Sequence, residues 1–426
     1  MNRIILIGNG FDLAHLMPTS YKNFIDDYWQ NVIEQLKQKG AGSSYNNEQI
    51  EIKSIPPIFD FQKRPYENLT ESVKKHNVSY NRIISRILFR NKFLEKITKE
   101  SYLNKWVDIE NEYYKELKNI LKDTSNHFQI ETLNNDLETI KNLLIDYLNK
   151  VESKSDLHPE KIIRIKNDIG YKIYFPYNPK DFSEEGKNKI LEIEFNKLKL
   201  IKDGIDRNSI NRNDLPEHTK KLIDYLNFEE PLIHVRQKLF SDSCHNHFNL
   251  DLNEVLFLTF NYTFTEKLYK SPSSFDSFGQ MKTPNIQQIH IHGTIDKYDK
   301  NPIIFGYGDE LDDDYLNIEK LNDNRFLDNI KSIKYSESDN YKKVLEFVNS
   351  DIYQIFIMGH SCGTSDRTLL NTLFEHENCV SIKTFYHQKD DENDNFSDVI
   401  RNISRNFNDK TKMRDRVVNK IFCQKI

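Results

Sequence analysis

The chain has 426 residues, of which 37% are hydrophobic and 29% charged, and its formal net charge is -5. This length supports one large hydrophobic core or two smaller ones, and the charge provides no overall basic field, which disfavours nucleic acid as a partner. No run approaches the roughly 20 apolar residues of a membrane span, and the first apolar run, Ile4 to Ile7, is too short for a signal-peptide core. We therefore expect no membrane partner.

The cysteines show no paired spacing. The chain has four of them, Cys244, Cys362, Cys379 and Cys423, and none forms a C-x-x-C motif. This spacing predicts neither a disulfide framework nor a zinc knuckle. We expect a reducing, cytoplasmic setting and no bound metal.

The first element in chain order is a strand over Arg3 to Ile7, followed by the turn Gly8-Asn9-Gly10 and a helix. Glycines in such a turn permit close approach of a phosphate to the amino end of the helix. The dinucleotide fingerprint, however, requires a third glycine where this chain has Leu13, so a dehydrogenase is disfavoured. The alternative interpretation is an ordinary strand–helix turn with Asp12 as the N-cap.

A long helical region is predicted next. Apolar residues from Phe24 to Leu36 recur at helical spacing, and residues from about 80 to 245 are rich in Lys, Glu, Asn and Leu with the same period. Within this region SYLNKWVDIENEYYKELKNILK reads as one helix, with Trp106 and Ile109 on one face. The stretch IGYKIYFPYNPKDF is predicted to be a hairpin or an extended excursion.

After residue 250 the sequence changes to short apolar runs, each ended by Gly, Asn, His or Thr. The runs are EVLFLTFNYT, QQIHIHGTI, NPIIFGYG, QIFIMGHS and VSIKTFYH. They are typical of buried parallel strands. We predict an α/β fold with a Rossmann-like (sirtuin-like) parallel sheet, formed by residues 1–40 and 250–426 and split by a mainly helical insertion, residues 41–249.

Several of these runs end in polar residues that parallel strands would gather at one edge of the sheet. Thr259 and Asn261 follow one run, and His290, His292 and Gly293 follow the next. On a strand, both imidazoles would point the same way, towards a metal or a substrate. No third ligand is evident, so we favour His292 as a general base beside a glycine that admits a ligand.

The segment Gly359 to Asp366 follows another strand. Its small residues and hydroxyls suit ribose or phosphate contacts, and Asp366 lies where the next helix begins. Gly359-His360-Ser361-Cys362-Gly363 also fits the G-x-S-x-G pattern of serine hydrolases. That chemistry is disfavoured, because it requires an acid and then a histidine downstream, where only His376 and His387 remain.

Together these motifs resemble the AbiH family of bacterial proteins, which is associated with abortive infection against phage. The motifs that carry the resemblance are IILIGNGFDLAH-x-x-PTSY, WVDIE, FNYT, HIHG and GHS-x-x-x-SD. They span nearly the whole chain. The chain departs from the family pattern at Leu16-Met17, where the family usually has Gly-Leu before the proline.

The same series is more distantly similar to sirtuin-like domains, including those that destroy NAD. This resemblance implies NAD as substrate or ligand, with Asn261 and His292 as a catalytic pair. It places Gly8, Gly10, Gly359 and Ser361 around the dinucleotide. The sirtuin Ser is replaced by Asp12 and the Asp of N-x-D by Thr263, and the paired cysteines of the deacetylase zinc module are absent.

We therefore predict a defence effector that binds NAD or a related nucleotide and hydrolyses its nicotinamide–ribose bond. Asp12 would join the catalytic pair as a carboxylate near the sugar. The remaining expected nucleotide contacts are Asn9, Thr259, Gly293 and Asp366. Alternatives are a nucleotide sensor or interaction module without turnover, and a nuclease-type toxin supported by the histidine pair. A phage-derived trigger protein and a second copy of the chain are further expected partners. Glu110 in WVDIE is predicted to be a solvated helix residue, and the alternative is that it faces the site or a regulatory surface.

Overall fold

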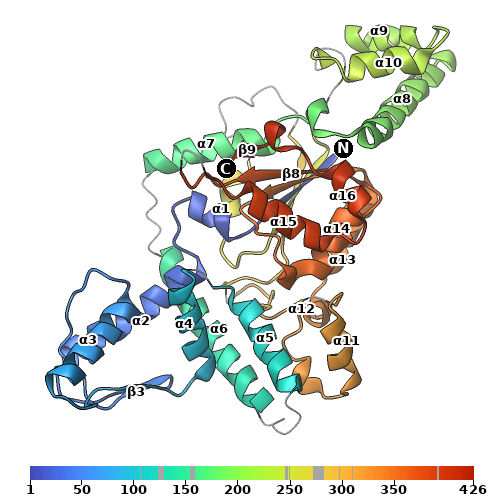
Figure 1. Cartoon of the computed structure of the whole chain (residues 1–426). Coiled ribbons are helices and arrows are strands. Elements are labelled where there is room, and N and C mark those ends of the chain that lie inside the picture. Colours follow the sequence, from blue (N-terminus) through green and yellow to red (C-terminus); the bar gives the residue numbers. More distant parts are fainter. Residues whose placement is uncertain are drawn as a thin grey trace.

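A six-stranded, all-parallel sheet forms the centre of the computed structural model (Figure 1). The structure describes residues 1–105, 107–122, 129–153, 159–244, 248, 250–271, 283–296, 298–308, 310–390 and 393–426. The strands lie in the order β6-β5-β1-β7-β8-β9. Their bounds are β1 (Asn2–Ile7), β5 (Glu254–Thr259), β6 (Asn285–His290), β7 (Tyr353–Met358), β8 (Cys379–Tyr386) and β9 (Gln424–Lys425). Counted along the chain, this is the 3-2-1-4-5-6 order of a Rossmann sheet, and the predicted fold class is confirmed.

Strand β1 is the central strand, with β5 on one side and β7 on the other. All six of its residues are buried, which explains the continuous apolar run Ile4 to Ile7. Because side chains alternate along a strand, Ile4 and Leu6 join the hydrophobic cluster on one face, and Ile5 and Ile7 join the cluster on the other.

Helices cover both faces of the sheet. Leu370, Phe374 and Ile403 belong to the cluster of Ile4 and Leu6, and Ile173 to the cluster of Ile5 and Ile7. The helices of the first face are α13 (Asn340–Ser350), α14 (Arg367–Glu375) and α15 (Phe396–Asn406), and those of the second are α1 (Asn9–Ala14) and α7 (Pro159–Tyr174).

A helical arm projects from the side of the sheet where the strands have their carboxyl ends, at the lower left and lower centre of Figure 1. It holds its own hydrophobic cluster, built around Trp29, Leu94 and Tyr113. Its helices are α2 (Tyr21–Lys39), α3 (Pro65–Ser79), α4 (Lys92–Leu103), α5 (Ile109–Lys122) and α6 (Gln129–Ser153), and its three-stranded antiparallel sheet consists of β2 (Tyr45–Asn46), β3 (Ile50–Ile52) and β4 (Ile87–Phe89).

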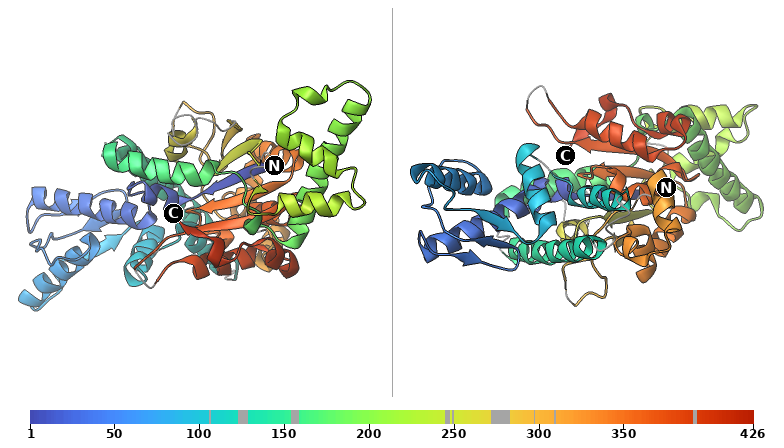
Figure 2. Two further views of the ribbon diagram at one scale, coloured as in Figure 1. Left: turned by 90° about the horizontal axis from the view of Figure 1, so that it is seen from above. Right: turned by 60° about the horizontal axis from the view of Figure 1, so that its bottom comes forward.

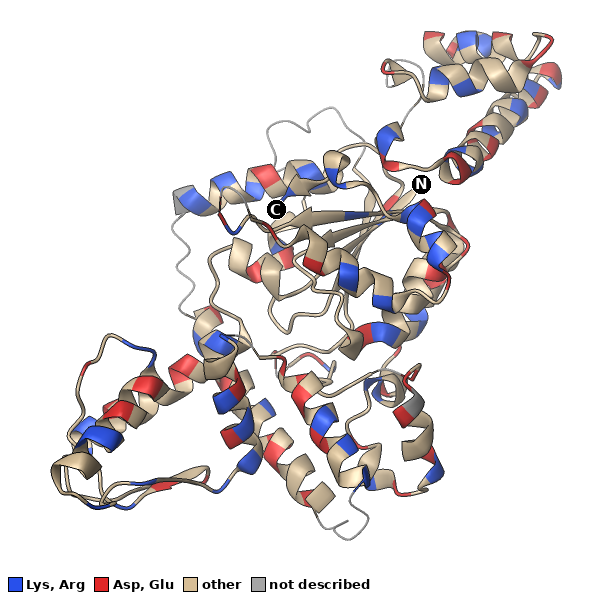
Figure 3. Ribbon diagram, viewed as in Figure 1, with Lys and Arg blue, Asp and Glu red and all other residues tan. Residues whose placement is uncertain are grey.

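A second helical projection, which we call the distal helices, lies at the opposite end of the molecule (Figure 2). It comprises α8 (Glu184–Asp206), α9 (Glu217–Tyr225) and α10 (Pro231–Leu239). Its cluster includes Met1 and Val380, which lie at the amino-terminal ends of β1 and β8. Acidic and basic residues are interspersed along these helices, as expected of solvated faces (Figure 3).

The remaining elements are short. They are α11 (Asp313–Lys320), α12 (Lys331–Lys334), α16 (Lys410–Arg416) and the 3-10 helices η1 (Pro179–Asp181), η2 (Arg212–Asp214), η4 (Thr265–Tyr269), η6 (Asn324–Phe326), η7 (Tyr335–Glu337), η8 (Thr364–Asp366) and η9 (Lys420–Phe422). Among the described residues, no helix has the length and apolar character needed to cross a membrane.

Three local predictions are wrong. The single helix expected around Ile109 is two helices, because α4 ends at Leu103 and Asp108 accepts a hydrogen bond from Asn111 N–H in the first turn of α5; Trp106 lies outside the described residues. The first part of IGYKIYFPYNPKDF is the end of α7. NPIIFGYG forms no strand, and its backbone bonds instead to the turn after β6, with Ile304 N–H donating to His292 C=O.

The predicted division at residues 40 and 250 stays a prediction, but packing separates the chain between these points into three parts. Helices α3 to α6 belong to the helical arm, α7 returns to the sheet, and α8 to α10 form the distal helices.

Candidate functional site

A cavity of about 310 Å³ lies at the carboxyl ends of β1, β5, β6 and β7. The helical arm supplies its opposite wall, with Leu144 and Leu148 from α6 and Asp108 and Glu110 at the start of α5. The cavity therefore lies between the sheet and the helical arm. This is the edge where parallel α/β sheets bind ligands, close to the point at which the strand order reverses.

Most of the residues predicted from the sequence line this cavity. They are Gly8, Asn9, Gly10, Asp12, Asn261, His292, Gly359, Ser361 and Asp366. Thr259 and Gly293 are not among the lining residues. Thr259 accepts a hydrogen bond from Asn261 N–H at 3.1 Å, and Gly293 has a φ of +82° in the turn after β6, where an added Cβ would lie 2.1 Å from Pro302 C=O. Both therefore shape the loops behind the lining.

The glycine turn after β1 packs directly against the loop after β7. Gly10 N–H donates to Gly359 C=O at 2.9 Å, and Phe11 N–H donates to Gly8 C=O at 2.9 Å. A Cβ on Gly10 would lie 2.9 Å from Gly359 Cα. The glycines thus allow the backbone after β1 to contact the backbone after β7, and this packing is a reason for glycine here besides the approach of a ligand.

Asp12 is buried inside α1, so the interpretation of Asp12 as an N-cap is wrong; Gly8 holds that position. Its carboxylate accepts hydrogen bonds from Thr263 at 2.6 Å and Thr265 at 2.7 Å. Burial raises the pKa of Asp12, and the bonds from the threonine hydroxyls oppose that rise. Asn261 lies next to it and donates from Nδ2 to Gly8 C=O at 3.1 Å.

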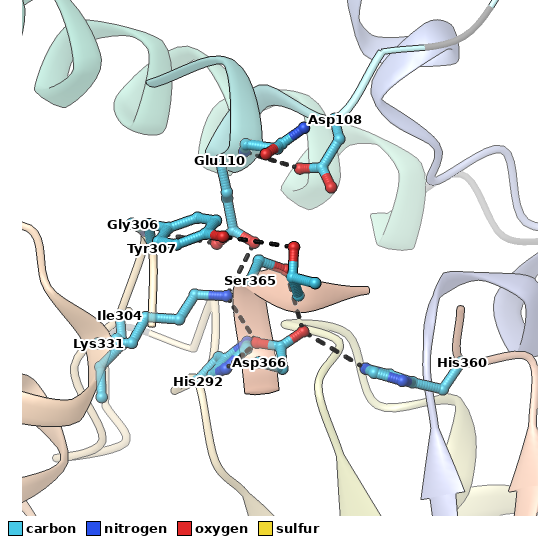
Figure 4. A network of polar contacts seen from close by, with 12 residues as sticks. Asp108, Glu110, His292, Ile304, Gly306, Tyr307, Lys331, His360, Ser365 and Asp366 are labelled. Carbon is cyan, nitrogen blue, oxygen red and sulfur yellow. Dashed lines mark hydrogen bonds and ion pairs between the residues drawn. The ribbon is translucent and has the colours of Figure 1, made fainter. Parts of the chain in front are cut away.

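A buried ion network forms another wall (Figure 4). Lys331 of α12 is fully buried, and its Nζ lies 2.8 Å from Glu110 Oε2 and 2.8 Å from Asp366 Oδ1. Asp366 also faces two imidazoles, with His292 Nε2 at 3.3 Å and His360 Nε2 at 3.6 Å. The network thus connects the helical arm to the two histidines through one lysine and one aspartate.

The ion network sets the charge states of its members. Burial would raise the pKa of Asp366, but Lys331 and His292 hold it well below its usual range. Burial, assisted by Lys331, lowers the pKa of His292 to about 4, so this imidazole is neutral at pH 7. Because Asp366 is an acceptor facing Nε2, the proton of His292 resides on Nε2, which leaves Nδ1 as its basic nitrogen.

The two histidines of HIHG do not act together. Strand β6 ends at His290, and Gly293 N–H donates to His290 C=O, so a turn replaces the strand alternation on which the paired-imidazole prediction rests. His290 Nε2 lies 3.2 Å from Glu266 Oε1, whereas His292 faces Asp366. In the described part of the chain, no group of three or more His, Cys, Asp or Glu side chains is placed to hold a metal ion. The four cysteines are buried.

Sequence reasoning missed part of the network. No sequence motif marks Lys331, and the prediction of Glu110 as a solvated residue is wrong, because Glu110 is 7% exposed and bound to Lys331. The WVDIE motif was the available signal for Glu110. A lysine in KSIK gives no comparable signal, since its ion pairs are made with Glu110 of α5 and Asp366 of η8, which are distant in the sequence.

The pKa of Glu110 leads to a pH-dependence test. Burial raises the pKa of Glu110 to about 8, and the positive charge of Lys331 opposes part of this rise. Because the folded chain holds the proton of Glu110 more tightly than the unfolded chain does, protonation of Glu110 stabilises the fold. This stabilisation is fully present below pH 4.5, near the pKa of Glu110 in the unfolded chain, and is lost as the pH rises through about 8. We expect the thermal midpoint of the wild type to fall relative to that of Glu110→Gln between pH 5 and pH 8.5. Glu138→Gln, an exposed change on α6, serves as control, and a difference that is constant with pH would contradict the assignment.

Comparison with known proteins gives one match. The family model described as bacteriophage abortive infection AbiH matches residues 4–205 and 194–388, which is more than half of the chain. No curated protein and no solved structure matches. The similarity to sirtuin-like domains therefore stays a prediction.

Proposed function

The chain belongs to the bacteriophage abortive infection AbiH family, and we propose that it serves this defence by hydrolysing NAD or a related nucleotide in the cavity between the sheet and the helical arm. One observation carries the proposal. The cavity lies where the Rossmann strand order reverses, and it gathers Asp12, Asn261 and His292 from the segments that follow three different strands. Such an edge is the usual ligand site of doubly wound sheets.

The reaction needs little chemistry from the protein. The bond between the nicotinamide nitrogen and C1′ breaks, its electron pair leaves with neutral nicotinamide, and a water oxygen bonds to C1′ while one proton is released. The amide of Asn261 would orient this water and Nδ1 of His292 would take the proton. The Asp12 carboxylate would stabilise the positive charge that develops on the sugar.

Release of nicotinamide from NAD tests the proposal. We expect the purified wild type to release nicotinamide when a phage-derived trigger is supplied, and Asn261→Ala and His292→Ala to lower the rate by at least a hundredfold. His387→Ala, which changes an exposed histidine, is the control and should retain the wild-type rate. Melting curves of each variant establish that it is folded. No release from the triggered wild type, or equal release from both active-site variants, would contradict hydrolysis.

A second candidate is nucleotide sensing without turnover. It is favoured by the internal bonds of the site, because both carboxylate oxygens of Asp12 already accept threonine hydroxyls and Gly10 N–H is bonded to Gly359. A nucleotide that copurifies with the chain and is not consumed after triggering would support this candidate over hydrolysis.

A further inference from the structure

The cavity raises the question of which end of a nucleotide it encloses. Its volume of about 310 Å³ lies at the lower end of the range for small-molecule pockets, about 300–1,000 Å³. A cavity of this size suits one nucleoside-sized group better than a whole dinucleotide. The chemistry of its walls then decides which group enters.

The walls are rich in carboxylates. Asp12, Asp108, Glu110 and Asp366 line the cavity, whereas Lys22 is the one lysine or arginine among the described lining residues. The ammonium of Lys22 lies 3.0 Å from Asp26, a carboxylate that Arg64 also contacts at 2.9 Å. Behind the lining, Lys331 lies 2.8 Å from both Glu110 and Asp366. Asp366 is thus paired with Lys331, and burial raises the pKa of Glu110 to about 8, so Asp12 and Asp108 are the carboxylates that would oppose a phosphate placed here.

Three backbone N–H groups at the start of α1 that a phosphate could use are already engaged. In the glycine turn, Gly8 N–H donates to Met358 C=O at 3.4 Å, and the N–H groups of Gly10 and Phe11 donate to Gly359 and Gly8. Anion sites at the ends of strands in Rossmann folds depend on such groups being directed at the ligand. The turn therefore offers little to a pyrophosphate.

Aromatic rings complete the lining. Tyr21, Phe260 and Tyr262 line the cavity together with the carboxylates. Phe260 is held between the two imidazoles, with ring centroids 5.1 Å from His292 and 4.1 Å from His360. Aromatic faces next to carboxylates are the chemistry that recognises a flat organic cation.

We propose that the cavity encloses the cationic N-ribosyl pyridinium end of the nucleotide and leaves the phosphates outside. This inference rests on the proposed function, because it takes a nicotinamide nucleotide as the ligand. Its substrate class is an N-ribosylated pyridinium, and the adenylate portion contributes little to binding. The positive charge of the ring then resides among the carboxylates, and it is removed from the cavity when neutral nicotinamide forms.

Binding of four ligands tests the inference. Calorimetry at 4 °C with the full chain compares NAD, nicotinamide riboside, ADP-ribose and NADH. We expect nicotinamide riboside to bind within about tenfold of NAD, because it keeps the cationic ring and lacks the pyrophosphate and adenosine. ADP-ribose lacks the ring and NADH lacks its charge, so both should bind at least tenfold more weakly than NAD. ADP-ribose binding as tightly as NAD would overturn the inference.

A charge variant sharpens the test. Asp108→Asn removes one carboxylate charge and keeps an oxygen for the hydrogen bond from Asn111 N–H, which preserves the start of α5. We expect it to weaken binding of NAD and nicotinamide riboside about three- to tenfold and to leave ADP-ribose unchanged. Glu138→Gln, an exposed carboxylate change on α6, should alter none of these values. Equal weakening of all ligands by Asp108→Asn would contradict the assignment.

The outcome for the inference is separable from the outcome for hydrolysis. If nicotinamide riboside binds as expected but NAD is not cleaved, the ligand class is supported and hydrolysis fails. If NAD is cleaved but ADP-ribose binds as tightly, hydrolysis is supported and the ligand class fails. Absence of binding by all four ligands overturns both.

Discussion

Replacing Lys331 with methionine is expected to destabilise the chain by about 3–5 kcal/mol, because it leaves buried carboxylate charge without its partner. Lys331 is fully buried and lies 2.8 Å from both Glu110 and Asp366. Asp366 is the more costly of the two to leave unpaired, since its pKa is held well below the usual range and it remains ionised at neutral pH. Methionine keeps the length of the side chain, so the loss reports charge and hydrogen bonding more than volume.

Urea unfolding of single and double variants separates these contributions. In the double variant Lys331→Met with Asp366→Asn both charges are absent, so its destabilisation should be smaller than the sum of the two single changes. Lys334→Met changes a half-exposed lysine of the same helix and should cost less than about 1 kcal/mol. Additive single changes, or a Lys331→Met variant as stable as Lys334→Met, would show that the ion network does not hold the helical arm and the sheet domain together.

The same substitution is informative about the histidines. Burial and the Lys331 charge together lower the pKa of His292 to about 4. Loss of the lysine removes the second of these causes, so the pKa of His292 should rise in Lys331→Met. Lys331 thus has two physical roles: it pairs Glu110 of the helical arm and Asp366 beside the sheet, and it adds to the effect of burial in lowering the pKa of His292.

The sheet could be predicted from the sequence because buried parallel strands appear there as short, continuous apolar runs. Four of the five apolar runs after residue 250 correspond to strands β5, β6, β7 and β8. Parallel strands have their carboxyl ends on the same side of the sheet. This rule predicts that Asp12, Asn261, His292 and Asp366 lie close together, and all four line the cavity.

The fifth run shows why apolar character alone is insufficient. NPIIFGYG is apolar because it lies between two cores, with Ile304 in the cluster on the sheet and Phe305 in the cluster of the helical arm. Its backbone bonds to loops and not to a neighbouring strand, for example Tyr307 N–H to Asn329 C=O at 3.0 Å. A buried connection and a buried strand have the same composition, and only the partner of the backbone distinguishes them.

The ion network could not be predicted for a different reason. Charged residues are expected to be solvated, and Lys331 and Glu110 both occur in segments rich in polar residues. Lys331 is paired in the interior by Asp366 and by Glu110, and Glu110 is 221 residues away along the chain. A pattern read along one segment contains no information about such a partner.

The glycine of the loop after β7 gives the second large expected effect. Gly359→Ala should destabilise the chain by more than about 4 kcal/mol, because two penalties act at one position. Gly359 has a φ of +77°, where an L side chain is strained by about 1–2 kcal/mol. In addition, its Cβ would lie 2.0 Å from Phe11 N and 2.4 Å from Gly10 C, and backbone atoms cannot rotate away.

Two other glycines separate the two penalties. Gly40 has a φ of +82° and open space around an added Cβ, so Gly40→Ala should show the backbone strain alone, about 1–2 kcal/mol. Gly363 has a φ of -63°, and its Cβ would be 3.7 Å from the nearest neighbour, Ser361 Oγ, so Gly363→Ala should be close to neutral. Urea unfolding midpoints of the three variants provide the comparison. If Gly359→Ala costs no more than Gly40→Ala, the loops after β1 and β7 are free to separate, and the glycine turn is then open to a phosphate in a way that the packed arrangement does not allow.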